Sequence, residues 1–328
     1  METFLQQLIN GLTLGAVYAV VALGYTMVYG IIQLINFAHG EVVMIGAMVA
    51  FTVITMLAAS GLPPVVIVFI GAACAIPVCM IVGYLLERIA YRPLRNAPRL
   101  APLITAIGMS IVLQHFAMMV WTPNNLAVPQ IIKTGTYDLA GASITNVQIV
   151  IVIMCFVLMG GLLWLVHRTR LGISMRATAQ NPKVAGLMGV NINREIAITF
   201  AIGAALGAVA GVMVGSYYGI AHYQMGALLG LKAFCAAVLG GIGNVPGAMV
   251  GGLLLGVIEA LGAGYIGDLT DLCAVTWLFS GLAERCAAGE HISLFGSNYQ
   301  DVFAFLVLIA VLVFRPSGLL GERVGDRA

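Results

Sequence analysis

Residues 168–194 read RTRLGISMRATAQNPKVAGLMGVNINR and lie between two long apolar runs, residues 139–166 and 196–231. The stretch contains five basic residues and no acidic one: Arg168, Arg170, Arg176, Lys183 and Arg194. Because basic loops between membrane spans stay in the cytoplasm, it predicts a cytoplasmic loop joining two spans. Residues 182–189 (PKVAGLMG) favour a short helix parallel to the membrane. A loop with its own helix is suited to contact a soluble partner.

The composition indicates a membrane protein. Hydrophobic residues make up 61% of the 328 residues, charged residues only 9%, and the mean hydropathy is +1.04. A soluble domain carries about 25% charged residues, so we expect an all-α polytopic membrane protein. The 40 glycines favour close helix packing in lipid. The few basic residues, which lie at membrane edges, argue against a nucleic-acid partner.

Runs without Asp, Glu, Lys or Arg mark the spans. They cover residues 3–40, 42–86, 100–132, 139–166, 196–231, 233–258 and 302–314. Because one spanning helix needs about 20 apolar residues, the longest runs should each hold two elements, and we expect about eight or nine crossings in a single domain.

Three basic clusters set the orientation: residues 87–99, 168–194 and 315–327. All three should be cytoplasmic. Spans near 101–121 and 147–166 then leave residues 122–146 outside, and an even number of crossings must separate Arg194 from Arg315. Three crossings before Glu87 would place the N-terminus outside.

Glycine recurs every four residues at Gly203, Gly207, Gly211, Gly215 and Gly219. On a helix these positions form one ridge. The ridge is either a static, closely packed face or a surface on which a second helix slides. Residues 239–248 (LGGIGNVPGA) cannot be a regular helix throughout and form either a tight turn at the membrane edge or a broken helix.

Polar residues inside apolar runs are the candidates for a pathway or gate. Asn36, His39 and Glu41 form the densest group, which is either a surface turn with Glu41 capping the next helix or a gate. Lys232 and Glu259 could form a buried salt bridge, or the Lys232 side chain could instead extend to the membrane interface. Asn244 joins these candidates, whereas Gln114 and His115 fit packing roles.

Signals for chemistry are absent from the sequence. The six cysteines are scattered without a metal-binding spacing, and neither a hydrolase motif nor an ATP-binding P-loop is present. We therefore expect no cofactor, no metal and no enzyme activity. If ATP drives this protein, another chain must bind it.

Several segments together resemble the membrane permeases of bacterial ABC importers for branched-chain amino acids, of the LivH type. They are residues 10–19 (NGLTLGAVYA), 24–32 (GYTMVYGII), 35–41 (INFAHGE), 87–95 (ERIAYRPLR), 105–110 (TAIGMS), 231–234 (LKAF), 237–248 (AVLGGIGNVPGA) and 314–321 (FRPSGLLG). The resemblance covers nearly the whole chain. Permeases for urea and short amides look similar, and a stand-alone channel or secondary transporter is the rival from another class.

The resemblance implies an inner-membrane complex. A second, homologous permease subunit would complete the pathway, two cytoplasmic ATPases would drive it, and an extracytoplasmic binding protein would deliver substrate. It also implies a coupling helix that docks into the ATPase, with matching positions at Arg176, Ala177, Asn181, Pro182, Ala185, Gly186 and Gly189.

The chain departs from that family near its end, where about two dozen extra residues lie between residues 269 and 297. Only Arg285 is basic there, so the insert should be extracytoplasmic. It is an interfacial helix, a contact for the binding protein or a neutral elaboration, and we favour the last two equally. Cys273 and Cys286 could form a disulfide in that compartment.

Overall fold

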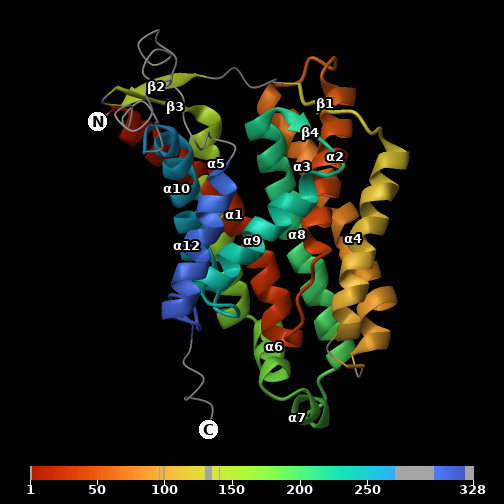
Figure 1. Ribbon diagram of the computed structural model, residues 1–328. Helices are drawn as coiled ribbons and strands as arrows, with labels where there is room; N and C mark the ends of the chain where they lie inside the picture. Colours follow the sequence, from red (N-terminus) through yellow and green to blue (C-terminus); the bar gives the residue numbers. More distant parts are fainter. Residues whose placement is uncertain are drawn as a thin grey trace.

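The computed structural model describes residues 2–95, 97–98, 100–129, 135–139, 141–269 and 299–321. Most of this is helical (Figure 1). The helices are α1 (Glu2–Ile32), α2 (His39–Leu57), α3 (Pro64–Leu85), the π-helical η1 (Leu86–Tyr91), the 3-10 turn η2 (Arg92–Leu94), α4 (Leu100–Val120), α5 (Asn146–Arg168), α6 (Arg170–Gln180), α7 (Pro182–Leu187), α8 (Ile192–Tyr218), α9 (Met225–Gly240), α10 (Val245–Leu269) and α12 (Gln300–Phe314).

Seven stretches of helix in the described chain are long and apolar enough to cross a membrane, and α9 and residues 304–314 add two shorter apolar helices. The expected all-α polytopic fold is thereby confirmed. The expectation that each of the longest runs holds two elements is wrong for residues 3–40. That run holds the single 31-residue helix α1, an irregular stretch and only the first residues of α2.

One end of the molecule, here called the sheet end, carries two small antiparallel sheets (Figure 1). In the first, β1 (Leu126–Ala127) pairs with β4 (Ile220–Ala221). In the second, β2 (Thr136–Leu139) and β3 (Ala142–Thr145) form a hairpin in which Thr136 faces Thr145. The start of α1 lies here too, because the Ser143 N–H donates to the Gln6 side chain at 2.8 Å.

The opposite end, here called the basic end, holds η1, η2, α6, α7 and residues 315–321 (Figure 1). Of the basic residues that the structure describes, only Lys232 lies on an element away from this end. The N-terminus lies opposite the basic clusters, which is the arrangement expected if three helices cross before Glu87, and α1, α2 and α3 precede that residue. Helices α8, α9, α10 and α12 make the expected even number of passages, while the insert at 269–297 and its two cysteines lie outside the described residues.

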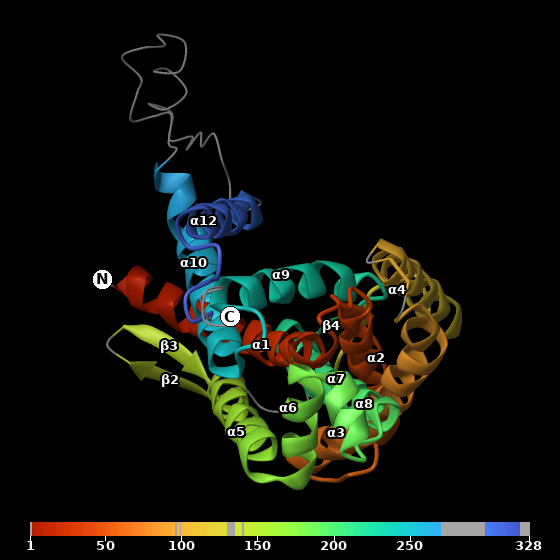
Figure 2. The same ribbon diagram turned by 90° about the horizontal axis from the view of Figure 1, so that it is seen from below.

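Helix α1 forms the buried centre, packed on α8, α9 and α10. It approaches α10 very closely, since a Cβ added at Gly15 would lie 2.7 Å from the Leu253 Cα. By contrast, α4 and α5 are mostly exposed and lie at the periphery (Figure 2). This pattern of a small-residue interior with an apolar exterior is typical of helices in lipid.

The glycine ridge packs within the chain. A Cβ at Gly203 would lie 3.3 Å from the Gly24 oxygen of α1, and one at Gly211 would lie 2.6 Å from the Ala47 nitrogen of α2. Gly219 departs from the expectation, because it ends α8 in the left-handed conformation with φ of 67°. The ridge is therefore tightly packed at Gly203 and Gly211, whereas Cβ atoms at Gly207 and Gly215 would make ordinary contacts at 3.5 and 3.8 Å. Sliding of a second helix on the ridge stays a prediction.

Within residues 239–248, residues 241–244 form a tight turn between the end of α9 at Gly240 and the start of α10 at Val245. Gly241 and Gly243 have φ of 104° and 96°, conformations that favour glycine. The C-terminal segment pairs with the end of α9, since the Leu319 and Leu320 N–H groups donate to the Leu239 and Gly240 oxygens at 2.8 and 3.0 Å. This settles the alternative in favour of the turn.

Candidate functional site

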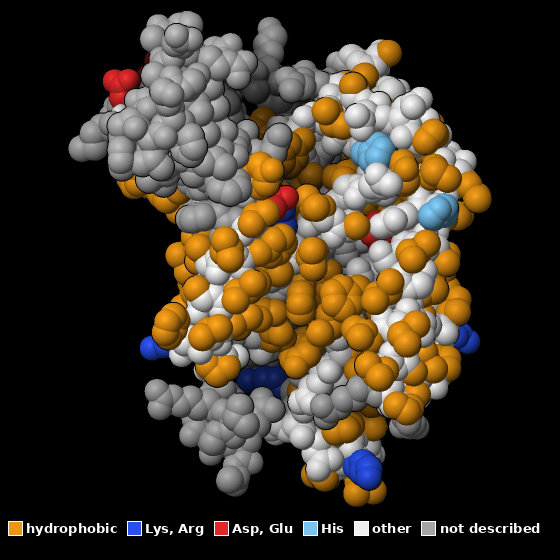
Figure 3. Space-filling model, viewed as in Figure 1, with side chains coloured by type: hydrophobic (Ala, Val, Ile, Leu, Met, Phe, Trp, Pro, Cys, Tyr) orange, Lys and Arg blue, Asp and Glu red, His pale blue; other side chains and the backbone are white. Residues whose placement is uncertain are grey.

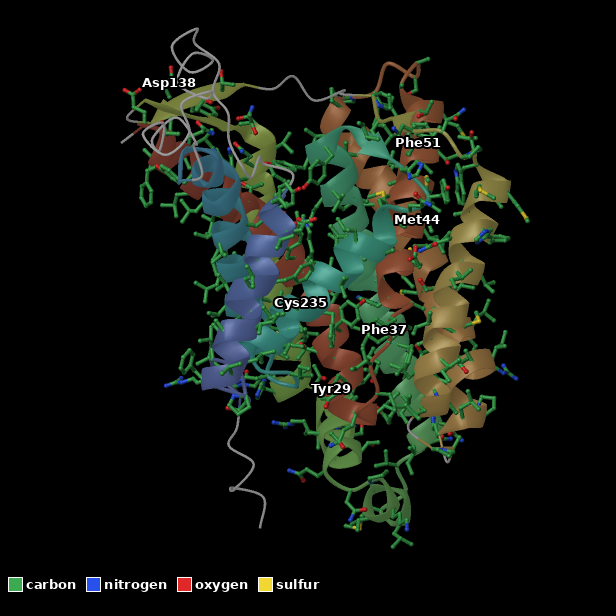
Figure 4. All side chains as sticks on the ribbon, in the orientation of Figure 1. Tyr29, Phe37, Met44, Phe51, Asp138 and Cys235 are labelled. Atoms are coloured by element: carbon green, nitrogen blue, oxygen red, sulfur yellow. The ribbon has the colours of Figure 1, made fainter. Side chains whose placement is uncertain are left out.

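Helix α2 begins inside the molecule. In Figure 4, Tyr29 lies near the lower end of α1, while Phe37, Met44 and Phe51 lie successively higher. Residues 33–38 are not helical, and Asn36 is only 3% exposed. The interpretation of this segment as a surface turn is therefore wrong. Irregular backbone at such depth is tolerated only where protein buries it or where it lines a cavity.

Three polar side chains surround the start of α2. The Tyr91 hydroxyl donates to the Asn36 oxygen at 2.7 Å. The His39 ring stands edge-on against Tyr25, with centroids 4.8 Å apart. Glu41 is fully buried and accepts hydrogen bonds from α4, as described next. We call Asn36, His39 and Glu41 the α2-start cluster.

Glu41 links α2 to α4. Its Oε1 accepts from the Ser110 hydroxyl at 3.0 Å and from the Gln114 amide at 2.7 Å. Its Oε2 and the Nε2 of His39 are buried without a hydrogen-bond partner among the described residues. Unpaired buried polar atoms are costly, so they are more typical of a functional site than of ordinary packing.

Glycines bring α9 against the start of α2. A Cβ added at Gly40 would lie 2.8 Å from the Gly230 Cα, and one at Gly226 would lie 2.6 Å from Glu41 Oε2. Only glycine leaves room for this approach, because any side chain would displace one of the two helices. The α2-start cluster is thus held between α4 on one side and α9 on the other.

A second cluster joins four helices through charge. Lys232 of α9 forms ion pairs with Glu259 of α10 at 2.7 Å and with Asp301 of α12 at 2.6 Å. The Tyr18 hydroxyl of α1 donates to Glu259 at 3.0 Å. We call these four residues the Lys232 cluster. With one ammonium facing two carboxylates, the cluster is electrostatically unbalanced, and only Asp301 is appreciably exposed, at 31% of its side chain.

Aromatic rings lie along α9 near the two clusters. Phe234 packs against Tyr25 and Phe37, with centroid separations of 6.2 and 5.6 Å. A narrow crevice beside them is lined by Tyr25, Tyr29, Ile35, Phe234, Ala237 and Ile242. These residues give α9 and the irregular segment a shared apolar wall, which suits contact with an aliphatic side chain.

The clusters lie behind a concave face. In Figure 2, α9 crosses between one rim of α10 and α12 and another rim of α2 and α4. Figure 3 shows that side mostly covered by hydrophobic side chains, with a few charged atoms between them. Leu228 and Leu231 of α9 are exposed. The face therefore combines an apolar floor with charged groups at mid-depth.

The basic loop folds into two helices rather than the single short one expected. The Asn181 side chain separates α6 from α7 and accepts from the Lys183 and Val184 N–H groups, with Pro182 as the first residue of α7. Ala185 is buried, whereas Leu187 and Met188 are 87% and 83% exposed. Gly186 faces Ile192, 3.3 Å from its added Cβ, and Gly189 ends the turn with φ of 88°. Arg176 is exposed on α6, and Ala177 is half-buried.

The structure brings some predicted residues together and separates others. Asn36, His39 and Glu41 lie together at the start of α2. Lys232 and Glu259 form a buried ion pair. Asn244 lies apart in the α9–α10 turn, where its amide donates to the Leu320 oxygen at 2.8 Å. No group of metal-binding side chains occurs in the described part of the chain.

Sequence reasoning missed Ser110, Gln114, Tyr18 and Asp301. Gln114 was assigned to packing, although a polar amide in an apolar run is itself a signal for a buried polar partner. Asp301 directly precedes the last apolar run, residues 302–314, so it does not stand inside a charge-free run as Lys232 and Glu259 do.

Residues 7–312 match the family model described as "Branched-chain amino acid transport system / permease component". The chain belongs to this family. It is 48% identical to the high-affinity branched-chain amino acid transport system permease protein BraD of Pseudomonas aeruginosa, over 97% of the chain and 96% of BraD. It is 44% identical to LivH of Escherichia coli over the same shares.

A more distant relative carries a different name. The autoinducer 2 import system permease protein LsrC of Klebsiella pneumoniae is 34% identical over 49% of the chain and 40% of LsrC. No solved structure matches the chain.

Proposed function

We propose that this chain is the permease subunit of an ATP-driven importer that carries branched-chain amino acids across the bacterial inner membrane. The observation that supports this best is the concave face, with α9 as its floor and α12 and α4 at its rims (Figure 2). Such a face is one wall of a pathway. The names of the relatives, which extend over nearly the whole chain, supply the substrate class.

A second, homologous permease subunit closes the pathway in this proposal. Asp301 is 31% exposed beside the buried Lys232, and an ionisable group at mid-depth is expensive next to lipid. A partner subunit would remove Asp301 from the hydrocarbon while leaving a polar path between the two floors. The exposed Leu228 and Leu231 would then face either the partner or the passing substrate.

Two ATPases dock at the basic end in this proposal. Helix α7 offers Leu187 and Met188 almost fully exposed beyond the spans, and an apolar helix tip of this kind suits a groove in a partner. Asn181, Pro182, Ala185 and Gly189 shape that tip, while Arg176 and Ala177 belong to α6 beside it.

The two buried clusters are the proposed gate. The α2-start cluster joins α2 to α4, and the Lys232 cluster joins α9 and α10 to α12, so each one spans elements of a different rim. A change in either cluster would alter the width of the concave face. Asn244 fits a different role, because it fastens the α9–α10 turn to the C-terminal segment.

At the sheet end, an extracytoplasmic binding protein would deliver the amino acid. The β2–β3 hairpin contacts the start of α1 there through Ser143 and Gln6. Aromatic and aliphatic residues along α9 suit an apolar side chain but supply few donors for a small polar amide. This chemistry favours a branched-chain amino acid over urea.

The test is uptake of radiolabelled leucine by proteoliposomes that contain the purified complex. We expect uptake that requires ATP, the ATPases and the binding protein, and that excess valine or isoleucine suppresses. Suppression by urea or acetamide with no effect of valine would assign the complex to amides. Uptake by this chain alone, without ATP, would instead identify a channel or secondary transporter.

A further inference from the structure

A cleft of about 330 Å³ opens at the basic end between the η1–η2 region and the start of α8. It lies away from the concave face, since α3 and α8 occupy the opposite side in Figure 2. None of the residues assigned above to the pathway or to α7 lines it. Its lining is Tyr84, Arg92, Asn191, Asn193, Arg194, Ala197, Ile198 and Ala201.

The lining changes from polar to apolar along the helix axis. Arg194 and the two asparagines lie at the start of α8, while Ala201 lies seven residues further along, or about 10 Å at 1.5 Å per residue. Tyr84 of α3 similarly lies deeper than Arg92. The cleft therefore has a polar end at the start of α8 and an apolar end further along that helix.

The polar end of the cleft has an excess of positive charge. The carboxylate of Glu87 is fully buried and serves two guanidinium groups, those of Arg92 at 2.8 Å and of Arg95. Arg95 also donates to the Asn193 oxygen at 2.7 Å, which fixes one wall of the cleft. Of the charged side chains nearby, Glu195 follows Arg194 in sequence but does not line the cleft.

Arg194 is the group in this region that is left for a ligand. Its backbone N–H is capped by Asn191, but its exposed side chain has no partner among the described residues. Arg88 is engaged with the Tyr84 hydroxyl at 3.1 Å, and Arg92 with Glu87. A phosphate placed here would receive charge-assisted hydrogen bonds from Arg194 and from the remaining N–H groups of Arg92.

We propose that this cleft binds the headgroup of an anionic phospholipid, with one acyl chain lying along Ala197, Ile198 and Ala201. Basic pockets between helices at the cytoplasmic side suit such lipids. The apolar half of the lining distinguishes a lipid from a free anion. The site is independent of the transported substrate, so its failure would leave the proposed function untouched.

The test is native mass spectrometry of the purified complex after exposure to phosphatidylglycerol or phosphatidylcholine. We expect the parent to retain phosphatidylglycerol at least about fivefold better than phosphatidylcholine. Arg194→Gln should remove most of this preference. Arg315→Gln is the matched control, because it removes an exposed positive charge at the same end but outside the cleft.

A second variant addresses the acyl chain. Ala201→Trp fills the apolar half of the cleft and should lower phosphatidylglycerol retention severalfold while the complex keeps its thermal stability. The proposal would be overturned if Arg315→Gln lost the preference for phosphatidylglycerol as fully as Arg194→Gln, or if the parent retained the two lipids equally. It would also be overturned if inorganic phosphate displaced the lipid completely, or if the permease alone retained the lipid and the bound ATPases abolished that retention. The last result would assign the cleft to a protein contact.

Discussion

Among the basic residues that the structure describes, Lys232 alone lies far from the basic end. Its ammonium group faces the carboxylates of Glu259 at 2.7 Å and Asp301 at 2.6 Å. Its position on α9 makes it the common partner of α10 and α12. Ion pairs buried at this depth contribute little net stability compared with apolar packing, but removing one member is costly. The Lys232 cluster is therefore expected to hold the rim of α10 and α12 against the floor.

Lys232→Met should destabilise the folded chain by about 3–5 kcal/mol, because it leaves the Glu259 carboxylate buried and uncompensated. Thermal unfolding in detergent measures this. The double variant Lys232→Met with Glu259→Gln should recover much of the loss, and Lys183→Met, on the exposed α7, is the control. Equal stability of Lys232→Met and the parent would contradict the ion-pair geometry.

For charged residues that are isolated in an apolar run, the sequence indicates that a partner is needed. A buried pair of Lys232 and Glu259 was one of two alternatives, because isolated charges in apolar runs must find a partner or reach the interface, and the structure has the pair. The third member, Asp301, was not predictable, since its contact depends on how α12 packs against α9. Ser110 and Gln114 were missed for the same reason: their partner Glu41 lies 69 and 73 residues away.

At the scale of elements, glycine spacing predicts where helices touch. Gly211→Leu should assemble poorly, because even a Cβ there would lie 2.6 Å from the Ala47 nitrogen of α2. Overpacking of this kind costs about 1–3 kcal/mol or more. Gly108→Leu in α4 is the matched control, since a Cβ at Gly108 meets nothing within 4 Å. The yield and the unfolding temperature of each purified variant are the measurements. Similar values for Gly211→Leu and Gly108→Leu would show that the ridge is not a tight contact.

Helix α7 supplies a second prediction at this scale. Leu187→Glu should reduce substrate-stimulated ATP hydrolysis by the complex about 10-fold or more, because burial of a leucine side chain is worth about 1.5–3 kcal/mol. Leu187→Met should retain it. Gly186 is a poorer probe, since a large residue there would also disturb Ile192 within the chain. Full stimulation with Leu187→Glu would exclude α7 as the docking element.

Apolar runs predicted α4 and α5 to within a few residues, because their ends are marked by charge or by loop residues. They failed at α2. Hydropathy does not report backbone conformation, so the irregular residues 33–38 remained hidden in a charge-free run. The division of the basic loop into α6 and α7 was also missed, although Asn181-Pro182 is a typical helix boundary.

For the whole molecule, the orientation is the firmest expectation. Asp138→Cys at the sheet end should react with a membrane-impermeant thiol reagent on intact cells stripped of their outer barrier, in a background without native cysteines (Figure 4). Lys183→Cys at the basic end should react only after permeabilisation. The reverse pattern would invert the topology, and the same assay at Ser297 would place the insert.

The basic clusters predicted which ends of the spans lie together at the basic end. The side of the N-terminus also depended on the number of crossings before Glu87, which the sequence left open. The concave face was not predictable. It arises because α9 crosses between two rims, and that geometry depends on the Gly40, Gly226 and Gly230 contacts rather than on any single span.

The most direct test of the account asks whether α9 lines a pathway. Leu231→Cys, exposed on α9, should react with a hydrophilic thiol reagent in the assembled complex, and leucine should slow that reaction severalfold. Phe156→Cys, equally exposed on α5 at the opposite side, should stay unreactive because it faces lipid. An unreactive Leu231→Cys, or the same rate at both positions, would contradict the pathway.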